Sequence, residues 1–108
     1  MTDATRKLKE TAQEVYDNYN RQKEKVEQAL KLEAEREIEW RKAQVWAEYN
    51  SNKTSREKLV TTWKMYMDAG ETVEAETVEM QKLYKKWLIA DNRFNVSLEE
   101  DAENGKNI

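Results

Sequence analysis

Four glutamates at every second position form a dense carboxylate cluster. In "EAEREIE" they are Glu33, Glu35, Glu37 and Glu39. In a helix this spacing spreads carboxylates around the axis rather than converging them on one site, and pairs such as Glu37 with Arg41 are typical of a solvated face. The chain has no histidine and no cysteine, so the commonest general base, the thiol nucleophile and most transition-metal ligands are missing. We therefore expect no enzymatic activity, no bound metal and no cofactor.

The segment "WRKAQVWAEY", residues 40–49, has the residue types of a protein contact. On a helix, Trp40 lies nearly opposite Ile38, Val45 and Tyr49, so the segment is apolar on two faces. The face with Ile38, Val45 and Tyr49 is expected to pack on the helical hairpin of the same chain, and the face with Trp40 on a second body. A tryptophan beside small alanines forms a knob next to a recess, and tryptophan is enriched among the residues that dominate interface energies. The predicted partner-binding residues are Trp40, Ala43, Trp46, Ala47, Arg41 and Lys42. Whether Trp40 contacts a second copy or a foreign protein stays open.

Basic side chains suggest an alternative ligand. Lys82, Lys85, Lys86 and Arg93 point to one side of a predicted helix. Such a face is able to bind nucleic acid by neutralising phosphates. Nucleic-acid binding is therefore the second interpretation, after protein binding.

The elements that carry these residues are all predicted to be helices. The chain contains no proline and only two glycines, and 38% of its residues are charged, a composition that favours an all-α fold. A first helix is expected over residues 3–49. Thr54 and Glu57 have the spacing of a capping box, which predicts a second helix over residues 55–68. Gly70 then predicts a helix end.

Thr72 is placed to cap a third helix, over residues 72–94. One stripe of this helix is apolar and comprises Val73, Met80, Leu83, Tyr84, Trp87 and Phe94. The second helix has a similar stripe, formed by Leu59, Val60, Trp63, Tyr66 and Met67. Trp63 and Trp87 are therefore predicted to lie in the core. The expected fold is a three-helix bundle, in which a long N-terminal helix packs on a C-terminal helical hairpin.

The long helix is expected to form a homodimer. Its apolar residues recur at a spacing of eleven, as in Leu8, Tyr19 and Leu30, which predicts nearly straight helix pairs. A short hairpin covers only half of a helix about 70 Å long, so a second chain is expected to cover the rest. The predicted dimerisation residues are Leu8, Val15, Tyr19 and Val26. The alternative is a break within residues 17–20, which gives a monomeric four-helix bundle.

Charge separates the chain into a body and a tail. The net charge of -3 resides in the last eleven residues, "LEEDAENGKNI". We expect a single neutral domain over residues 1–97, followed by a flexible acidic tail over residues 98–108. The chain has no run of 18 apolar residues and no apolar signal segment. The sequence therefore predicts a cytoplasmic, non-enzymatic protein-interaction module, such as an adaptor, inhibitor or assembly factor, with no membrane contact.

Overall fold

The computed structural model describes residues 1–106, and this part of the chain contains two α-helices and no strand. Helix α1 spans Asp3–Tyr49 and helix α2 spans Lys53–Lys106. The all-α class and the bounds of the first helix agree with the sequence prediction. The three-helix bundle is wrong, because α2 runs without interruption through the predicted break at Gly70. No described glycine has a positive φ.

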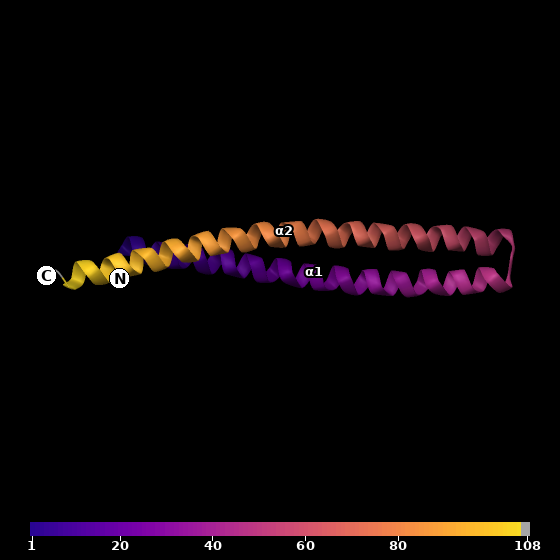
Figure 1. Cartoon of the computed structure of the whole chain (residues 1–108), viewed down its shortest axis with the longest axis horizontal. Coiled ribbons are helices and arrows are strands. Elements are labelled where there is room, and N and C mark those ends of the chain that lie inside the picture. The colour runs from indigo at the N-terminus through magenta and orange to yellow at the C-terminus, as the bar shows by residue number, and fades with distance from the viewer. Residues whose placement is uncertain (107–108) are drawn as a thin grey trace. The chain divides into compact units, whose positions relative to one another are not determined.

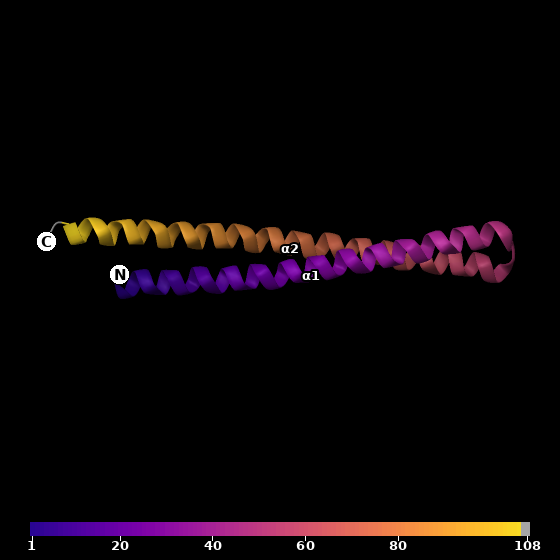
Figure 2. The same ribbon diagram turned by 90° about the horizontal axis from the view of Figure 1, so that it is seen from below.

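The chain divides into two compact units, and each helix contributes to both. Unit 1 consists of residues 1–23 and 79–108, and unit 2 of residues 24–78. Within each unit, a segment of α1 lies antiparallel to a segment of α2, as both views show (Figure 1, Figure 2). Each unit is therefore an antiparallel helix pair.

The inward-facing residues follow a heptad repeat in both units. In unit 1, a row of buried and half-buried residues comprises Thr5, Leu8, Ala12, Val15, Tyr19 and Gln22 on α1, and Met80, Leu83, Trp87, Ala90, Phe94, Ser97 and Asp101 on α2. Steps of three and four residues alternate along this row, which is the spacing of a coiled-coil seam. We call this row the seam of unit 1. The predicted spacing of eleven is therefore wrong as a description of the packed face, since Leu30 is exposed.

The seam of unit 2 continues with the same steps and contains many small or polar residues. On α1 it comprises Val26, Ala29, Glu33, Arg36, Trp40, Ala43 and Ala47, followed by Asn50 directly after the helix, and on α2 it comprises Ser55, Leu59, Thr62, Tyr66, Ala69, Val73 and Glu76. Ala43 is only 1% exposed. Because alanine places little between two backbones, Ala43 allows the helix segments to approach closely here.

Gly70 lies inside α2 next to the side chain of Glu33 and does not end a helix. A Cβ atom at this position would lie 3.1 Å from Oε2 of Glu33. The missing side chain therefore makes room for the carboxylate of a seam residue. Thr72, predicted to cap a third helix, lies inside α2 and donates its hydroxyl to the carbonyl of Asp68 (3.1 Å).

The cap of α2 lies two residues before the predicted one. The Oδ1 atom of Asn52 accepts a hydrogen bond from the backbone N–H of Ser55 (2.9 Å), and the N–H of Asn52 donates to Oγ of Ser55 (3.1 Å). These reciprocal bonds satisfy helix-terminal donors in the manner of a capping box. Ser55 is fully buried and also donates its hydroxyl to the carbonyls of Asn50 and Asn52.

Two further expectations differ from the structure. Helix α1 is continuous through residues 17–20, where a break was the alternative, and α2 extends through the segment predicted to be a flexible tail as far as Lys106. The last two residues of that predicted tail, 107 and 108, lie outside the described residues. Both helices are therefore long enough to cover each other within their units.

Candidate binding surface

Four large apolar side chains are exposed on α1 in unit 2: Ile38, Val45 and Tyr49 point away from the seam, and Trp46 flanks it. Ile38 and Val45 are each 54% exposed, Trp46 is 53% exposed and Tyr49 is 81% exposed. Ile38 and Val45 occupy the heptad position farthest from the seam, because they follow Glu33 and Trp40 by five residues. Ile38 and Val45 are therefore not needed to pack α1 against α2, whereas Trp46, six residues after Trp40, flanks the seam.

The four side chains line a shallow groove. Its volume is about 580 Å³, and Arg41, Lys42 and Asn50 complete its lining. We call these seven residues the outer groove. Both of its charged residues are basic. It lies on the last turns of α1, where the N–H of Asn50 bonds to the carbonyl of Trp46 (2.9 Å), so a regular helix holds the apolar side chains in place.

The two basic residues of the outer groove differ in their pairing. The guanidinium of Arg41 contacts Oε1 of Glu37 at 2.7 Å, and its side chain stays 69% exposed. Lys42 is exposed and forms no ion pair within residues 1–106. An exposed pair one helical turn apart contributes only about 0.3–0.5 kcal/mol, so Arg41 is free to exchange its partner.

The predicted contact residue Trp40 lies on the opposite side from the outer groove. It is half-buried in the seam of unit 2, and its ring centroid lies 4.7 Å from that of Trp63 and 5.6 Å from that of Tyr66. Trp63 itself is 42% exposed, so the prediction that it lies in the core is wrong: its ring packs on Trp40 at the edge of the seam. The face assignment for this segment was therefore wrong, because the expected inner residues, Ile38 and Val45, point outward. The seam here contains glutamate, arginine and alanine, so it cannot be recognised in the sequence as a row of large apolar residues.

The other predicted partner-binding residues divide between the two faces. Ala43 and Ala47 lie in the seam, whereas Trp46, Arg41 and Lys42 line the outer groove. Their role in partner binding stays a prediction. The structure adds Ile38, Val45 and Tyr49 to the exposed group. Their shared spacing along one face was visible in the sequence, but it was assigned to the core.

The predicted dimerisation residues lie in the two seams. Leu8, Val15 and Tyr19 are half-buried in unit 1, and Val26 is 7% exposed in unit 2. Tyr19 packs against Tyr84 of the same chain, with ring centroids 5.6 Å apart. The premise that a second chain must cover these residues is therefore wrong, because α2 covers them.

The basic residues of the alternative interpretation are all exposed. Lys82, Lys85, Lys86 and Arg93 lie on α2 in unit 1, and none forms an ion pair in the described part of the chain. Trp87, which lies among them in the sequence, is half-buried and packs on Tyr16 with ring centroids 5.3 Å apart. The lysines and the tryptophan therefore face different ways, as the helical spacing predicted.

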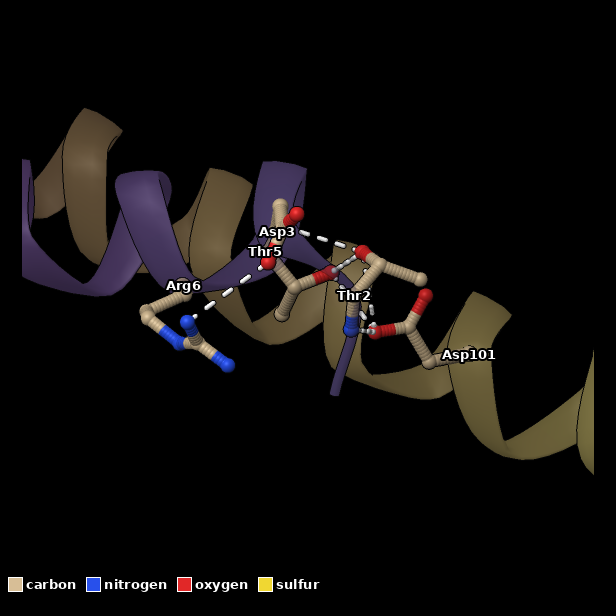
Figure 3. Close-up of polar contacts among 5 residues, drawn as sticks. All are labelled: Thr2, Asp3, Thr5, Arg6 and Asp101. Atoms are coloured by element: carbon tan, nitrogen blue, oxygen red, sulfur yellow. Dashed lines mark hydrogen bonds and ion pairs between the residues drawn. The ribbon is translucent and has the colours of Figure 1, made fainter.

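A polar cluster in unit 1 joins the start of α1 to the last turns of α2 (Figure 3). The Thr5 hydroxyl donates to Oδ2 of Asp101 (2.7 Å) and lies 2.6 Å from Oγ of Ser97. The backbone N–H of Thr2 donates to the same carboxylate oxygen (3.1 Å). The bonds from Thr5 and then Thr2 lower the pKa of Asp101. We call these four residues the polar clasp; sequence reasoning missed it because Asp101 was assigned to the tail.

Other functional features are limited within residues 1–106. No group of three or more acidic residues is placed to hold a metal ion. Neither helix contains a segment long and apolar enough to cross a membrane. Comparison with protein-family models, curated proteins and solved structures finds no match to this chain.

Proposed function

We propose that this chain is a non-enzymatic protein-interaction module that binds through the outer groove. One observation carries the proposal: Ile38, Val45, Trp46 and Tyr49 are exposed together on a face that the fold does not use. Single exposed apolar residues are ordinary, but a contiguous patch rimmed by polar residues is typical of an interaction site. The patch lies on a rigid helix, so binding requires little ordering of the surface.

The shape and charge of the outer groove favour a helical ligand. The apolar side chains extend over about 16 Å of α1, which matches the anchors of an amphipathic helix at intervals of three or four residues. Since the charged lining consists of Arg41 and Lys42, acidic residues beside those anchors are expected to strengthen binding. Trp46 supplies the largest anchor, and Tyr49 is the most exposed of the four.

A display library of amphipathic helical peptides, with the purified full chain as bait, tests the proposal. We expect enriched peptides to carry apolar anchors at helical spacing and acidic flanks. Fluorescence anisotropy should show that Trp46→Ala weakens their binding at least about 30-fold, since truncation of an interface anchor typically costs 2 kcal/mol or more. Met67→Ala is the matched control, because Met67 is exposed on α2 and outside the outer groove.

Two results would contradict the proposal. The first is a library that yields no peptide above background. The second is a set of peptides that bind wild type and Trp46→Ala equally well. In either case the outer groove is not a binding surface.

Nucleic-acid binding is the second candidate, favoured by the exposure of four basic residues on α2 that have no ion-pair partner within residues 1–106. Phosphate binding predicts a loss of affinity between about 50 and 200 mM salt. Labelled single-stranded and duplex DNA should then bind wild type and fail to bind a variant with Lys82, Lys85 and Lys86 changed to glutamate. Binding that this triple variant retains would exclude the basic face as its cause.

A further inference from the structure

We infer that the outer groove binds the same face of a second copy of the chain, with the two α1 segments antiparallel. This inference rests on the proposed function and names the partner. Four observations carry it: the spacing of the exposed residues, the register that this spacing permits, the charges beside it, and the area of the patch.

The outer groove contains a second seam. Ile38, Lys42, Val45 and Tyr49 are separated by steps of four, three and four residues. This is the spacing that pairs two helices in a coiled coil. Since the inner face of the same segment already packs on α2, α1 is built to lie between two helices in unit 2. An identical helix carries the same spacing and therefore fits it.

The antiparallel register that buries all four positions is self-complementary. It places Ile38 opposite Tyr49 of the second copy and Lys42 opposite Val45 of the second copy. Each contact occurs twice, because a twofold axis relates the copies. A parallel pairing would instead place Lys42 directly opposite Lys42, and opposed like charges are destabilising. The lysine therefore selects the antiparallel orientation.

The residues beside the second seam are complementary in charge. In the antiparallel register, Arg41 lies across from Glu48 of the second copy, once on each side of the axis. The Arg41 side chain is 69% exposed. Glu48 is exposed and has no ion pair within residues 1–106. On the other flank, Trp46 faces Glu39 of the second copy, whose aliphatic stem it is able to cover.

The area of the patch sets the strength of the association. Tryptophan and tyrosine bury 150–250 Å² each when fully covered, so the four partly exposed side chains present on the order of 400 Å² per copy. A standard stable interface buries about 800 Å² per partner. We therefore expect a reversible dimer in the micromolar range and a chain that folds without its partner.

Charge reversal tests the register without altering the fold. Sedimentation velocity on the full-length chain, from about 1 to 500 μM, should show wild type passing from monomer to dimer. Arg41→Glu and Glu48→Arg, each alone, place like charges across the axis twice and should weaken the dimer at least about tenfold. An equimolar mixture of the two variants restores both attractive pairs and should dimerise nearly as well as wild type.

Lys64→Glu is the control, because Lys64 is exposed on α2 in the same unit and does not line the outer groove. It should leave the dimer unchanged, and circular dichroism should show equal helicity for all variants. Three results would overturn the inference: a monomer at every concentration, a dimer unaffected by either reversal, or a mixture that fails to recover. If peptides still bind the groove of a monomeric chain, the proposed function stands and the inference fails.

Discussion

The aromatic residues of the two units are arranged differently. In unit 1, Tyr16 packs on Trp87 and Tyr19 on Tyr84, so the ring contacts join α1 to α2. In unit 2, Trp40 makes the same kind of contact with Trp63. Unit 2 has a further pair of aromatic residues, Trp46 and Tyr49, on the outward side of α1, where they are 53% and 81% exposed.

This difference separates the requirements of the fold from those of function. Unit 1 shows that two antiparallel helix segments are held together by ring contacts across one seam. Unit 2 has equivalent ring contacts between α1 and α2, so Trp46 and Tyr49 are not needed for folding. Exposed large apolar groups add no folding energy and promote non-specific association. Their grouping in the outer groove is therefore best explained by a specific partner.

The polar groups of the seams also differ. Unit 1 is closed by the polar clasp, in which Asp101 accepts hydrogen bonds from Thr2 and Thr5. Unit 2 instead places the carboxylate of Glu33 against Gly70. The Asp101 carboxylate joins two chain segments by hydrogen bonds. The Glu33 carboxylate fits into the space left by the missing side chain of Gly70.

The largest expected effect concerns the seam of unit 2. Trp40→Ala removes the ring that contacts both Trp63 and Tyr66 and should lower the free energy of unfolding by about 3 kcal/mol. Urea unfolding followed by circular dichroism measures this change. A loss below about 1 kcal/mol would show that the aromatic cluster does not hold unit 2 together.

A smaller loss of stability is expected when a buried alanine of either seam is enlarged to leucine, and its size should differ between the two units. Ala43 is 1% exposed, so Ala43→Leu should overpack the seam and lower stability by about 2 kcal/mol. Ala12, 6% exposed, borders a hollow of about 260 Å³ in unit 1, and Ala12→Leu should be tolerated better. Thermal melts of both variants, with the exposed Ala34→Leu as control, test this order. Equal losses at the two positions would contradict it.

Gly70→Ala is expected to stabilise the chain. Alanine favours a helix interior over glycine by about 0.8–1.0 kcal/mol, and the nearest atom to the new Cβ is the flexible end of Glu33, 3.1 Å away. A Cβ at Gly105 meets nothing within 4 Å, so Gly105→Ala in the last turn is the control, with a smaller gain. A destabilised Gly70→Ala would show that the Glu33 carboxylate is held firmly in place.

The polar clasp should make unit 1 sensitive to acid. Because hydrogen bonds lower the pKa of Asp101 in the folded chain, its stabilising effect is present above the ordinary aspartate pKa of about 3.9. It is lost as the pH falls below that value. Asp101→Asn should therefore lower the melting temperature at pH 7 and have little effect near pH 2. Glu100→Gln is the control, and equal effects at both pH values would contradict the role of the charge.

Sequence reasoning succeeded where hydrophobic spacing and packing agree. The bounds of α1 follow from the uninterrupted helical composition and from the loop after Tyr49. Most of the inner face of residues 73–94 also follows, since Val73, Met80, Leu83 and Trp87 are half-buried as expected. Tyr84 of the same predicted stripe is 43% exposed. In this segment the seam is marked by large apolar residues.

The same reasoning failed where the seam is polar or small. Glu33, Arg36 and Ala43 lie inward while Ile38 and Val45 lie outward, so apolar spacing selected the wrong side of α1. Gly70 resembled a helix end because its packing against Glu33, a residue distant in sequence, was not visible. Because α2 continues through Gly70, it packs along α1 in both units. The predicted dimer through residues 8–26 rested on the opposite assumption, that half of α1 lacks a packing partner in its own chain.

The central claim is that the two faces of residues 38–49 have separate roles, and Trp46→Ala tests it most directly. Unfolding and sedimentation should be measured on this variant and on wild type in parallel. The account predicts a free energy of unfolding within about 0.5 kcal/mol of wild type and a dimer weakened at least about 30-fold. A variant that loses as much stability as Trp40→Ala, or that dimerises like wild type, would contradict it.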